Sequence, residues 1–276
     1  MRRRYIVKDL LREITQTLNP CIPRASREAQ LLVMKYLEVD ELWLITHQNS
    51  EIEATEQLFE WVKKRKNNEP FEYITNSVSF YSEEFYIDEG ALIPRPETEL
   101  LIDEVIKSVP DKNSALTFAE VGVGSGIISI MLAKYFKNSK IIAVDISPKA
   151  LHVAQKNIEK FGLQEQIELR LGSLLEPVSE KIDYLVSNPP YIEEGVDLES
   201  NLSYEPQNAL FGGTVGDEII KELLDEVLKQ KIKFFSCEMG YDQQDKIRTH
   251  IQEKDFKSIE FYKDYSSFDR GFTLEV

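Results

Sequence analysis

Apolar residues at three- and four-residue spacing dominate the first 66 residues of the chain. The runs DLLREITQTL, SREAQLLVMKYL and EATEQLFEWVKKRKN each place their apolar side chains along one side of a helix. Ser26 is a candidate N-cap for the second helix, with Ala29, Leu32 and Val33 facing inward. Since no strand signal precedes Phe71, the pattern predicts a small helical bundle.

The pattern changes after residue 70. Alternating apolar residues over 78–87 predict a short β-hairpin. From residue 115 onward strands alternate with helices, through KIIAVDIS, PKALHVAQKNIEKFG and KIDYLVS, and the pattern predicts a hairpin at the end of the chain. This alternation is typical of a parallel, doubly wound sheet. We therefore expect an α/β protein with a helical recognition domain over residues 1–70, a β-hairpin linker over 71–92 and a Rossmann-like domain over 93–276.

The charge of the chain is high and uneven. Its 276 residues carry a net charge of -15, which argues against a large nucleic-acid footprint, because such binding needs Lys and Arg. Residues 1–75 are close to neutral, so the remainder carries this charge. The basic run KKRK at 63–66 is an RNA or partner contact, or simply a solvated helix end. No apolar run approaches the roughly 20 residues that span a bilayer, and we expect a cytosolic monomer with neither a nucleic-acid nor a membrane partner.

Cysteine and histidine usage limits the chemistry. Cys21 and Cys237 are far apart, so we expect two lone buried thiols rather than a disulfide. The three histidines are scattered, and their spacing indicates neither a metal site nor a nucleophile–histidine triad. The function expected here needs no metal.

A strand, a glycine-rich turn and a helix follow one another in FAEVGVGSGIISIMLA. The three glycines let the backbone approach a ligand closely, and the helix offers free N–H groups there. Asp145 ends the next strand about 20 residues later, where a carboxylate can accept both hydroxyls of a ribose. An N-cap role is the alternative for Asp145, but Ser147 already fits that position. The combination predicts a site for a cofactor that contains adenosine.

The spacing of the glycines distinguishes two such cofactors. NAD sites usually have G-x-G-x-x-G, whose third glycine packs the helix on the sheet, whereas the third glycine here comes one residue early. A cofactor without a pyrophosphate suits this turn better. Glu120, directly before the turn, is where a carboxylate would meet a cationic group. The sequence therefore favours S-adenosylmethionine over NAD.

The segment VSNPPYI ends its strand at two prolines, which cannot donate to a sheet ladder. Asn188 therefore lies at the C-terminal end of the strand, at the edge where such sheets bind ligands. Its side-chain oxygen, with the backbone carbonyl of Ser187 or Pro189, can accept both N–H groups of an amide or exocyclic amine. Tyr191 offers a flat face to a planar group. We interpret this corner as holding a nitrogen for methyl transfer by orientation, without a strong base; a turn without function is the alternative.

Several motifs together resemble a known family. NPPY after VGVGSG is similar to the amino-methylating methyltransferases that use S-adenosylmethionine. LIPRPETELL, SNPPYI, YEPQNALFGG and MGYDQ resemble the bacterial peptide chain release factor glutamine methyltransferases. The resemblance covers nearly the whole chain. It implies N5-methylation of the Gln in the Gly-Gly-Gln motif of class I release factors, which the helical N-terminal domain would help to hold.

The resemblance also assigns residues to the site. Those assigned to the cofactor are Glu120, Gly122, Val123, Gly124, Ser125, Gly126, Asp145, Ser173, Leu174 and Asn188. Those assigned to catalysis and to holding the Gln amide are Asn188, Pro189, Pro190 and Tyr191, with Arg95 of the PRPETE signature near the substrate. For PRPETE, a structural turn followed by a helix beginning near Glu97 or Thr98 is the alternative.

Three features depart from the family pattern, and other functions stay open. Glu120-Val121 replaces a frequent Asp-Leu, Ser173 stands where a Gly-Asp pair often contacts adenine, and the loop GGTVGDE is altered.

A ribosomal-protein glutamine methyltransferase shares the same motifs. A DNA adenine or cytosine amino-methyltransferase uses the same corner on a flipped base, but it would need a basic face. A binding module that has lost activity would be free to lose one of the three motifs.

Overall fold

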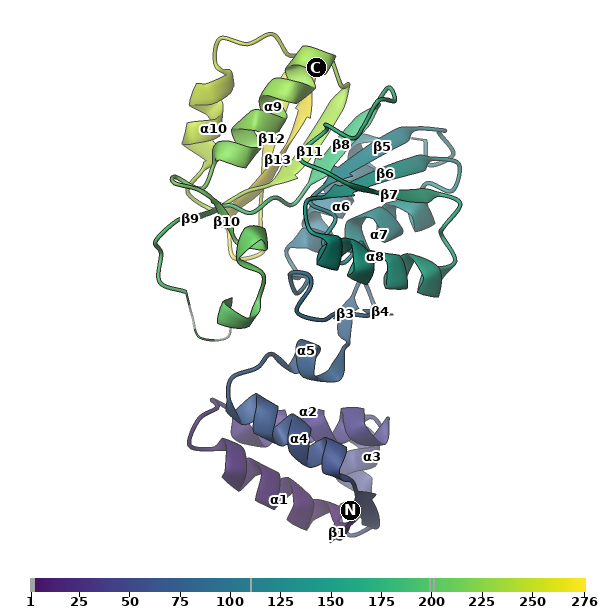
Figure 1. Cartoon of the computed structure of the whole chain (residues 1–276), viewed down its shortest axis with the longest axis vertical. Coiled ribbons are helices and arrows are strands. Elements are labelled where there is room, and N and C mark those ends of the chain that lie inside the picture. Colours follow the sequence, from purple (N-terminus) through teal and green to yellow (C-terminus); the bar gives the residue numbers. More distant parts are fainter. Residues whose placement is uncertain (1–2, 110, 199, 201) are drawn as a thin grey trace. The chain divides into compact units, whose positions relative to one another are not determined.

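The computed structural model describes residues 3–109, 111–198, 200 and 202–276. It contains two compact units (Figure 1). The first comprises Met1–Ser77 with Glu199–Tyr204, and the second comprises Val78–Leu198 with Glu205–Val276. Each unit encloses a hydrophobic core of its own. Among the residues described, no helix is both long and apolar enough to cross a membrane.

The first unit is built around helices whose apolar faces share one core. Its elements are β1 (Arg3–Ile6), α1 (Val7–Leu18), α2 (Ala25–Leu37), α3 (Glu41–Thr46), β2 (Glu51–Ala54), α4 (Glu56–Lys66), α5 (Phe71–Thr75) and the short 3-10 helix η1 (Leu202–Tyr204). On α1 the buried residues Val7, Leu10, Ile14 and Leu18 recur every three or four positions, which places them on one face. They pack in one cluster with buried residues of α2 and α4. The predicted helical bundle is confirmed, and Ala29, Leu32 and Val33 do face its core.

The first unit also contains a two-stranded sheet that the sequence pattern does not predict. Strands β1 and β2 pair antiparallel, with Tyr5 opposite Ile52, although no strand was expected before Phe71. Each strand has four residues and only part of its surface is buried. A pattern of four residues is too short to separate a strand from the start of the neighbouring helix.

Two smaller expectations for this unit were also wrong. Ser26 lies inside α2, which begins at Ala25 after Arg24 in a left-handed conformation, and no side chain caps that helix. Cys21 is exposed, and only Cys237 is a buried thiol.

The second unit begins with the expected hairpin. Strands β3 (Val78–Phe80) and β4 (Glu83–Phe85) pair antiparallel. The connecting residues Tyr81 and Ser82 both have positive φ, of 51° and 60°, as a two-residue hairpin turn requires. The alternating apolar residues that predicted the hairpin are buried.

A seven-stranded sheet forms the centre of the second unit. Its strands are β5 (Thr117–Val121), β6 (Lys140–Asp145), β7 (Ile167–Leu171), β8 (Tyr184–Ser187), β11 (Phe234–Glu238), β12 (Ser258–Lys263) and β13 (Asp269–Glu275). Their order is β12-β13-β11-β8-β5-β6-β7. The five strands from β11 to β7 are parallel, and β13 pairs antiparallel with both β11 and β12. The predicted doubly wound sheet and terminal hairpin are confirmed.

Helices cover both faces of this sheet (Figure 1). They are α6 (Thr98–Ser108), α7 (Ile127–Tyr135), α8 (Pro148–Phe161), α9 (Glu218–Gln230) and α10 (Gln244–Ile251). Three short elements complete the unit: β9 (Ile192–Glu193), η2 (Gln207–Ala209) and β10 (Phe211–Gly213). The helix α6 begins at Thr98, as the PRPETE segment predicts.

The strand order reverses between β5 and β8, and this reversal sets the position of the site. From β5 the chain continues outward to β6 and β7, and then returns to place β8 on the other side of β5. The register pairs Val121 with Ser187, the last residues of the two strands. The segments that follow them, the glycine turn and the Asn-Pro-Pro-Tyr corner, therefore emerge together. Such a switch point is where open α/β sheets bind ligands.

Asn157 of α8 fastens the end of the hairpin to the glycine turn. Its side chain is fully buried, accepts a hydrogen bond from the Tyr86 N–H at 2.7 Å, and donates to the carbonyls of Tyr86 and Ser125 at 2.9 and 2.8 Å. Three backbone groups thus rely on one amide. A leucine of similar size would leave all three without this partner.

We expect Asn157→Leu to lower the free energy of unfolding by about 2–4 kcal/mol, because buried polar groups lose their hydrogen bonds. Denaturant unfolding monitored by fluorescence would measure the change. Gln155→Ala, at an exposed position of the same helix, is the control and should stay within about 0.5 kcal/mol of wild type. Equal stability of the two variants would contradict this role for Asn157.

Candidate active site

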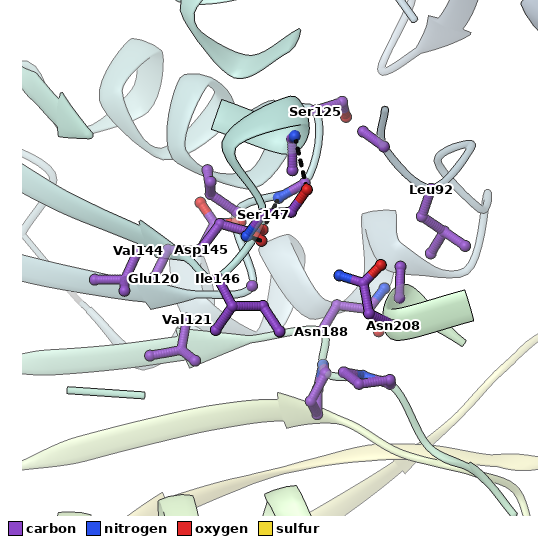
Figure 2. A pocket seen from close by; sticks show the side chains of 18 of the residues that line it. Leu92, Glu120, Val121, Ser125, Val144, Asp145, Ile146, Ser147, Asn188 and Asn208 are labelled. Atoms are coloured by element: carbon purple, nitrogen blue, oxygen red, sulfur yellow. Dashed lines mark hydrogen bonds between the residues drawn. The ribbon is translucent and has the colours of Figure 1, made fainter. Parts of the chain in front are cut away.

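A pocket lies at the C-terminal edge of β5, β6 and β8, and we call it the switch-point pocket (Figure 2). Among the site residues expected from the sequence, those lining it are Arg95, Glu120, Gly122, Val123, Gly124, Ser125, Asp145, Ser173, Leu174, Asn188, Pro189 and Pro190. Gly126 and Tyr191 are not among the described residues that line it. One pocket therefore gathers most of the motifs that are separate in the sequence.

The glycine turn is held against β6 by its own backbone. The N–H groups of Gly122 and Val123 both donate to the carbonyl of Val144, at 2.9 and 3.0 Å. Gly126 has a φ of 83°, and a Cβ added there would lie 3.2 Å from the Cβ of Ala154 on α8. The third glycine therefore allows α7 to begin close to α8, which explains why it packs behind the pocket instead of lining it.

Asp145 fixes the turn from the end of β6. Its Oδ2 accepts from the N–H of Gly124 at 3.0 Å, and its Oδ1 accepts from the N–H of Ser147 at 2.9 Å (Figure 2). Burial raises the pKa of this carboxyl, and the backbone hydrogen bonds oppose the change. The cap of α8 is made by Ser147, whose side chain accepts from the Ala150 N–H. Because each carboxylate oxygen can accept more than one hydrogen bond, Asp145 keeps capacity for the hydroxyls of a ligand.

Glu120 is a buried carboxyl with one incomplete side. It is 1% exposed and lines the pocket. Its Oε2 accepts from both the N–H and the hydroxyl of Ser129, whereas its Oε1 has no partner among the described residues. Burial raises the pKa of Glu120 to about 8, with the Ser129 hydrogen bonds acting in the opposite direction and the charge of Asp145 adding to the rise. An unpaired buried carboxylate oxygen beside a pocket is well suited to a cationic ligand group.

Asn188 follows the last residue of β8, and its strand is tied to β5 by the Ser187 hydroxyl, which donates to the Val121 carbonyl at 2.7 Å. The Asn188 Nδ2 donates to the Thr98 Oγ1 at 3.1 Å. Its Oδ1 accepts no hydrogen bond from the residues that the structure describes. Asn188, Pro189 and Pro190 all line the pocket. The corner thus presents an amide oxygen beside the glycine turn.

Tyr191 takes a different position from the one expected. Its side chain packs against the core of the second unit, and its hydroxyl donates to the Oε1 of Glu238 at 3.2 Å. Tyr191 therefore stabilises the corner from behind. Tyr191 is not among the described residues that line the pocket, and its expected contact with a planar group stays a prediction.

Arg95 lines the pocket while paired with a buried acid. Its Nη2 lies 2.6 Å from the Oε1 of Glu205, which is 4% exposed. The second oxygen of Glu205 accepts from the N–H of Ile93 at 3.0 Å. The PRPETE and YEPQ segments are thereby joined at one wall of the pocket. Arg95 both supports this wall and lines the pocket, and its expected role near the substrate stays a prediction.

The MGYDQ segment supports the Asn-Pro-Pro-Tyr corner through hydrogen bonds from one side chain. The Gln243 amide donates to the carbonyls of Tyr191 and Gly216, both at 3.0 Å, and its oxygen accepts from the N–H of Gly240 at 2.9 Å. One buried side chain therefore connects the loops after β8, β10 and β11. The altered loop at 212–218 is part of this support.

Several of the described residues that line the pocket were not expected there from the sequence. Thr98 lies within the quoted PRPETE segment and Asn208 within YEPQNALFGG, but neither residue was singled out. Ile219 and Glu222 of α9 also line the pocket. Ile219 and Glu222 belong to none of the motifs quoted from the sequence, and only the YEPQNALFGG resemblance could have pointed to Asn208.

The chain is similar to curated proteins over nearly its full length. The family described as the methyltransferase small domain matches residues 96–207, and the PrmC N-terminal domain matches residues 9–75. A release factor glutamine methyltransferase of Clostridium botulinum is 37% identical over 96% of this chain and 97% of its own length. The protein of the same name from Clostridium acetobutylicum is 34% identical over 88% of each chain.

Solved structures share the fold at much lower identity. The catalytic domain of human Mettl16, solved with an RNA hairpin, is 13% identical with a TM-score of 0.56, over 69% of this chain and 74% of its own. A human methyltransferase 10 domain containing protein is 17% identical with a TM-score of 0.54, over 71% and 89% of the two chains. Both likenesses support the Rossmann-like methyltransferase fold of the second unit.

A pair of glycine variants would test how closely the 212–218 loop approaches the corner. Gly216 and Gly195 both have positive φ, of 84° and 87°. A Cβ at Gly216 would lie 2.5 Å from the Tyr191 carbonyl oxygen, whereas one at Gly195 would have no described atom within 4 Å. Both alanine variants should lose about 1 kcal/mol of stability to backbone strain. Gly216→Ala should lose about 2 kcal/mol more of its free energy of unfolding because of the clash. Matching denaturation curves for the two variants would show that the loop yields freely.

Proposed function

The chain belongs to the release factor glutamine methyltransferase family, and we propose that it methylates the N5 nitrogen of the Gln in the Gly-Gly-Gln motif of class I release factors, using S-adenosylmethionine. The observation that carries this proposal is the juxtaposition of two sets of groups in one pocket. Asp145, Glu120 and the glycine turn form one side, and Asn188 with its two prolines forms the other. A methyl donor and an amide nitrogen can meet only if both sets face the same space.

The groups present fit the proposed cofactor. Asp145 has unused lone pairs for the two ribose hydroxyls. Glu120 has an oxygen without a partner among the described residues, suited to the positively charged methionine part. The left-handed glycine at 122 leaves room next to the backbone, since even an added Cβ would lie 3.7 Å from the Asn188 carbonyl. When bound, S-adenosylmethionine supplies an electrophilic methyl group.

Asn188 would orient the nitrogen that receives the methyl group. Its Oδ1 accepts one N–H of the Gln amide, and the carbonyl of Ser187 or Pro189 accepts the other. With both N–H bonds fixed, the face of the nitrogen is turned toward the methyl carbon. The two acceptors also draw the N–H hydrogens away and increase electron density on a weakly nucleophilic amide nitrogen. Since positioning alone can lower a barrier by several kcal/mol, this arrangement needs no strong base. The nitrogen becomes strongly acidic once the methyl carbon leaves sulfur and bonds to it, so one of its two hydrogens is lost as a proton to solvent.

The substrate proposed here is a protein, and the helical first unit is the proposed recognition domain. The net charge of -15 opposes binding to the phosphates of DNA or RNA. We also propose that the protein acts as a monomer. A ribosomal protein is the first substrate to try if release factors are not methylated.

Mass spectrometry of a release factor incubated with this protein and S-adenosylmethionine tests the proposal directly. We expect a single added methyl on the Gly-Gly-Gln glutamine, and a rate about a hundredfold or more lower for Asn188→Ala. The exposed Asn138→Ala is the matched control and should methylate at the wild-type rate. A methyl on another residue, or full activity in Asn188→Ala, would overturn the assignment of substrate or of the corner.

Cofactor binding should be coupled to release of a proton from Glu120. The pKa of Glu120 is raised to about 8 in the free protein, and a cationic ligand beside it favours the ionised form. Binding below this pH therefore releases a proton, and affinity should rise with pH up to about 8 and then level off. Calorimetry at pH 7 in buffers of different ionisation enthalpy would measure the proton release. Glu120→Gln should bind more weakly and release none at this site; an unchanged proton count would exclude Glu120 as the partner of the cation.

A further inference from the structure

A chain of buried polar groups continues from Asn188 into the protein. The Asn188 Nδ2 lies 3.1 Å from the Thr98 Oγ1, and this hydroxyl lies 2.8 Å from the Oε2 of Glu238. Thr98 is 2% exposed and Glu238 is 1% exposed. The other carboxylate oxygen of Glu238 accepts from the Tyr191 hydroxyl at 3.2 Å. The chain joins the first residue of α6 to the last residue of β11, directly behind the corner.

Counting hydrogens fixes the direction of this chain. An ionised carboxylate can only accept hydrogen bonds, so the single hydrogen of the Thr98 hydroxyl is donated to Glu238. The Thr98 oxygen can then only accept, and the one group of Asn188 able to donate to it is the NH₂. Asn188 must therefore turn its nitrogen toward Thr98 and its oxygen toward the pocket. If the Thr98 hydroxyl hydrogen pointed toward Asn188 instead, the Asn188 amide would be free to rotate and exchange the positions of its oxygen and nitrogen.

We propose that Thr98 and Glu238 are positioning residues that set the orientation of the Asn188 amide, and that this orientation selects a substrate amide over a carboxylate. The inference rests on the proposed function and deepens it. An outward Oδ1 accepts an N–H of Gln, whereas a carboxylate in the same place would bring two acceptors together. A buried pair of acceptors without a hydrogen is costly. The pocket would thus distinguish Gln from Glu at the reacting position.

The surroundings of Glu238 decide its charge at neutral pH. Burial raises the pKa of Glu238 to about 7, while the hydrogen bonds from Thr98 and Tyr191 and the positive charge of Arg270 oppose the rise, and Glu97 adds to it. Arg270 is itself paired with Asp264 at 2.7 Å. Burial raises the pKa of Tyr262 and of Cys237, and the charge of Glu238 adds to both rises.

The charge of Glu238 gives the chain a pH dependence. Above a pH of about 7 the carboxylate accepts from Thr98 and the chain has the productive direction. Below it, a protonated Glu238 can donate to Thr98, which can then donate to the Asn188 oxygen and turn the nitrogen toward the pocket. At saturating cofactor and release factor, kcat should therefore fall as the pH falls through this value.

Two variants of Thr98 distinguish its effect on the orientation of Asn188 from the effect of its packing. Thr98→Val keeps the shape but removes both hydrogen-bonding functions, and we expect kcat to fall by roughly ten- to a hundredfold. Thr98→Ser restores the hydroxyl and should recover most of the rate. Calorimetric affinity for S-adenosylmethionine should be the same in both. Equal rates in the two variants would overturn the inference while leaving the proposed function intact.

The selectivity for Gln over Glu can be measured by binding alone, without methyl transfer. Wild type should bind a release factor carrying Gln better than its Gln→Glu variant at the Gly-Gly-Gln motif, and Thr98→Val should reduce this ratio by roughly tenfold. A purely structural role for Thr98 would weaken binding of both proteins equally. An unchanged ratio in Thr98→Val would therefore count against the proposal.

A test that needs no substrate keeps the inference separate from the proposed function. The side-chain NH₂ signals of Asn188, assigned by their loss in Asn188→Asp, should shift in wild type as the pH passes about 7. Glu238→Gln has no group to ionise there, so the same signals should stay fixed and the acidic decline of kcat should disappear. If the signals do not move with pH in wild type, Glu238 does not set the Asn188 orientation. If they move but release factor is not methylated, the proposed function fails and the orientation stands.

Discussion

The parallel pairing of β5 with β8 is the constraint on which the whole site depends. The register sets Val121 opposite Ser187, and the Ser187 hydroxyl donates to the Val121 carbonyl, which reinforces that register. Since both strands stop at the same level, the glycine turn and the Asn188 corner leave the sheet side by side. A shift of one residue would turn every side chain of the strand to the opposite face of the sheet. The position of the reacting groups is therefore decided within the core, by strands that are buried except for the first residue of β5, before any loop contributes.

Much of this site could be predicted because its signals are local. The glycine turn, Asp145 and Asn188 each stand next to a strand that the apolar pattern identifies, and the rule that ligands bind at the carboxyl edge of the sheet brings them together. The supporting groups have no such signal. Thr98 and Glu238 are 140 residues apart in sequence, and Arg95 and Glu205 are 110 residues apart. Pairs of this kind form only when the sheet order places α6, β8 and β11 together, and a single sequence does not reveal that order.

Two residues take positions that their local sequence does not decide. Tyr191 was expected to offer a flat face to a planar group, and this role stays a prediction. Its hydroxyl instead finds a buried carboxylate, Glu238, and a phenol that is mostly apolar gains more from packing against the core than from an open pocket. Ser26 was expected to cap α2, but the chain enters that helix through a left-handed residue at Arg24, so the helix starts two residues earlier than a cap at Ser26 predicts. For Tyr191, a contact distant in sequence decided a position that local preference left open.

Glu120 and Glu238 are both buried carboxyls in this region. The protein supplies hydrogen-bond partners to both oxygens of Glu238 but to only one oxygen of Glu120. Ionising Glu120 or Glu238 costs stability, because the pKa of each is raised, to about 8 and about 7. Their contribution to folding is therefore largest at low pH and is lost as the pH rises through those values. Glu238 has hydrogen bonds on both oxygens and Arg270 nearby, so its charge is supported by the protein itself. Glu120 has a partner on one oxygen only. The difference matches the proposed roles: a carboxylate that orients Asn188 must hold its charge before the substrate arrives, whereas one that binds a cation gains its missing partner on binding.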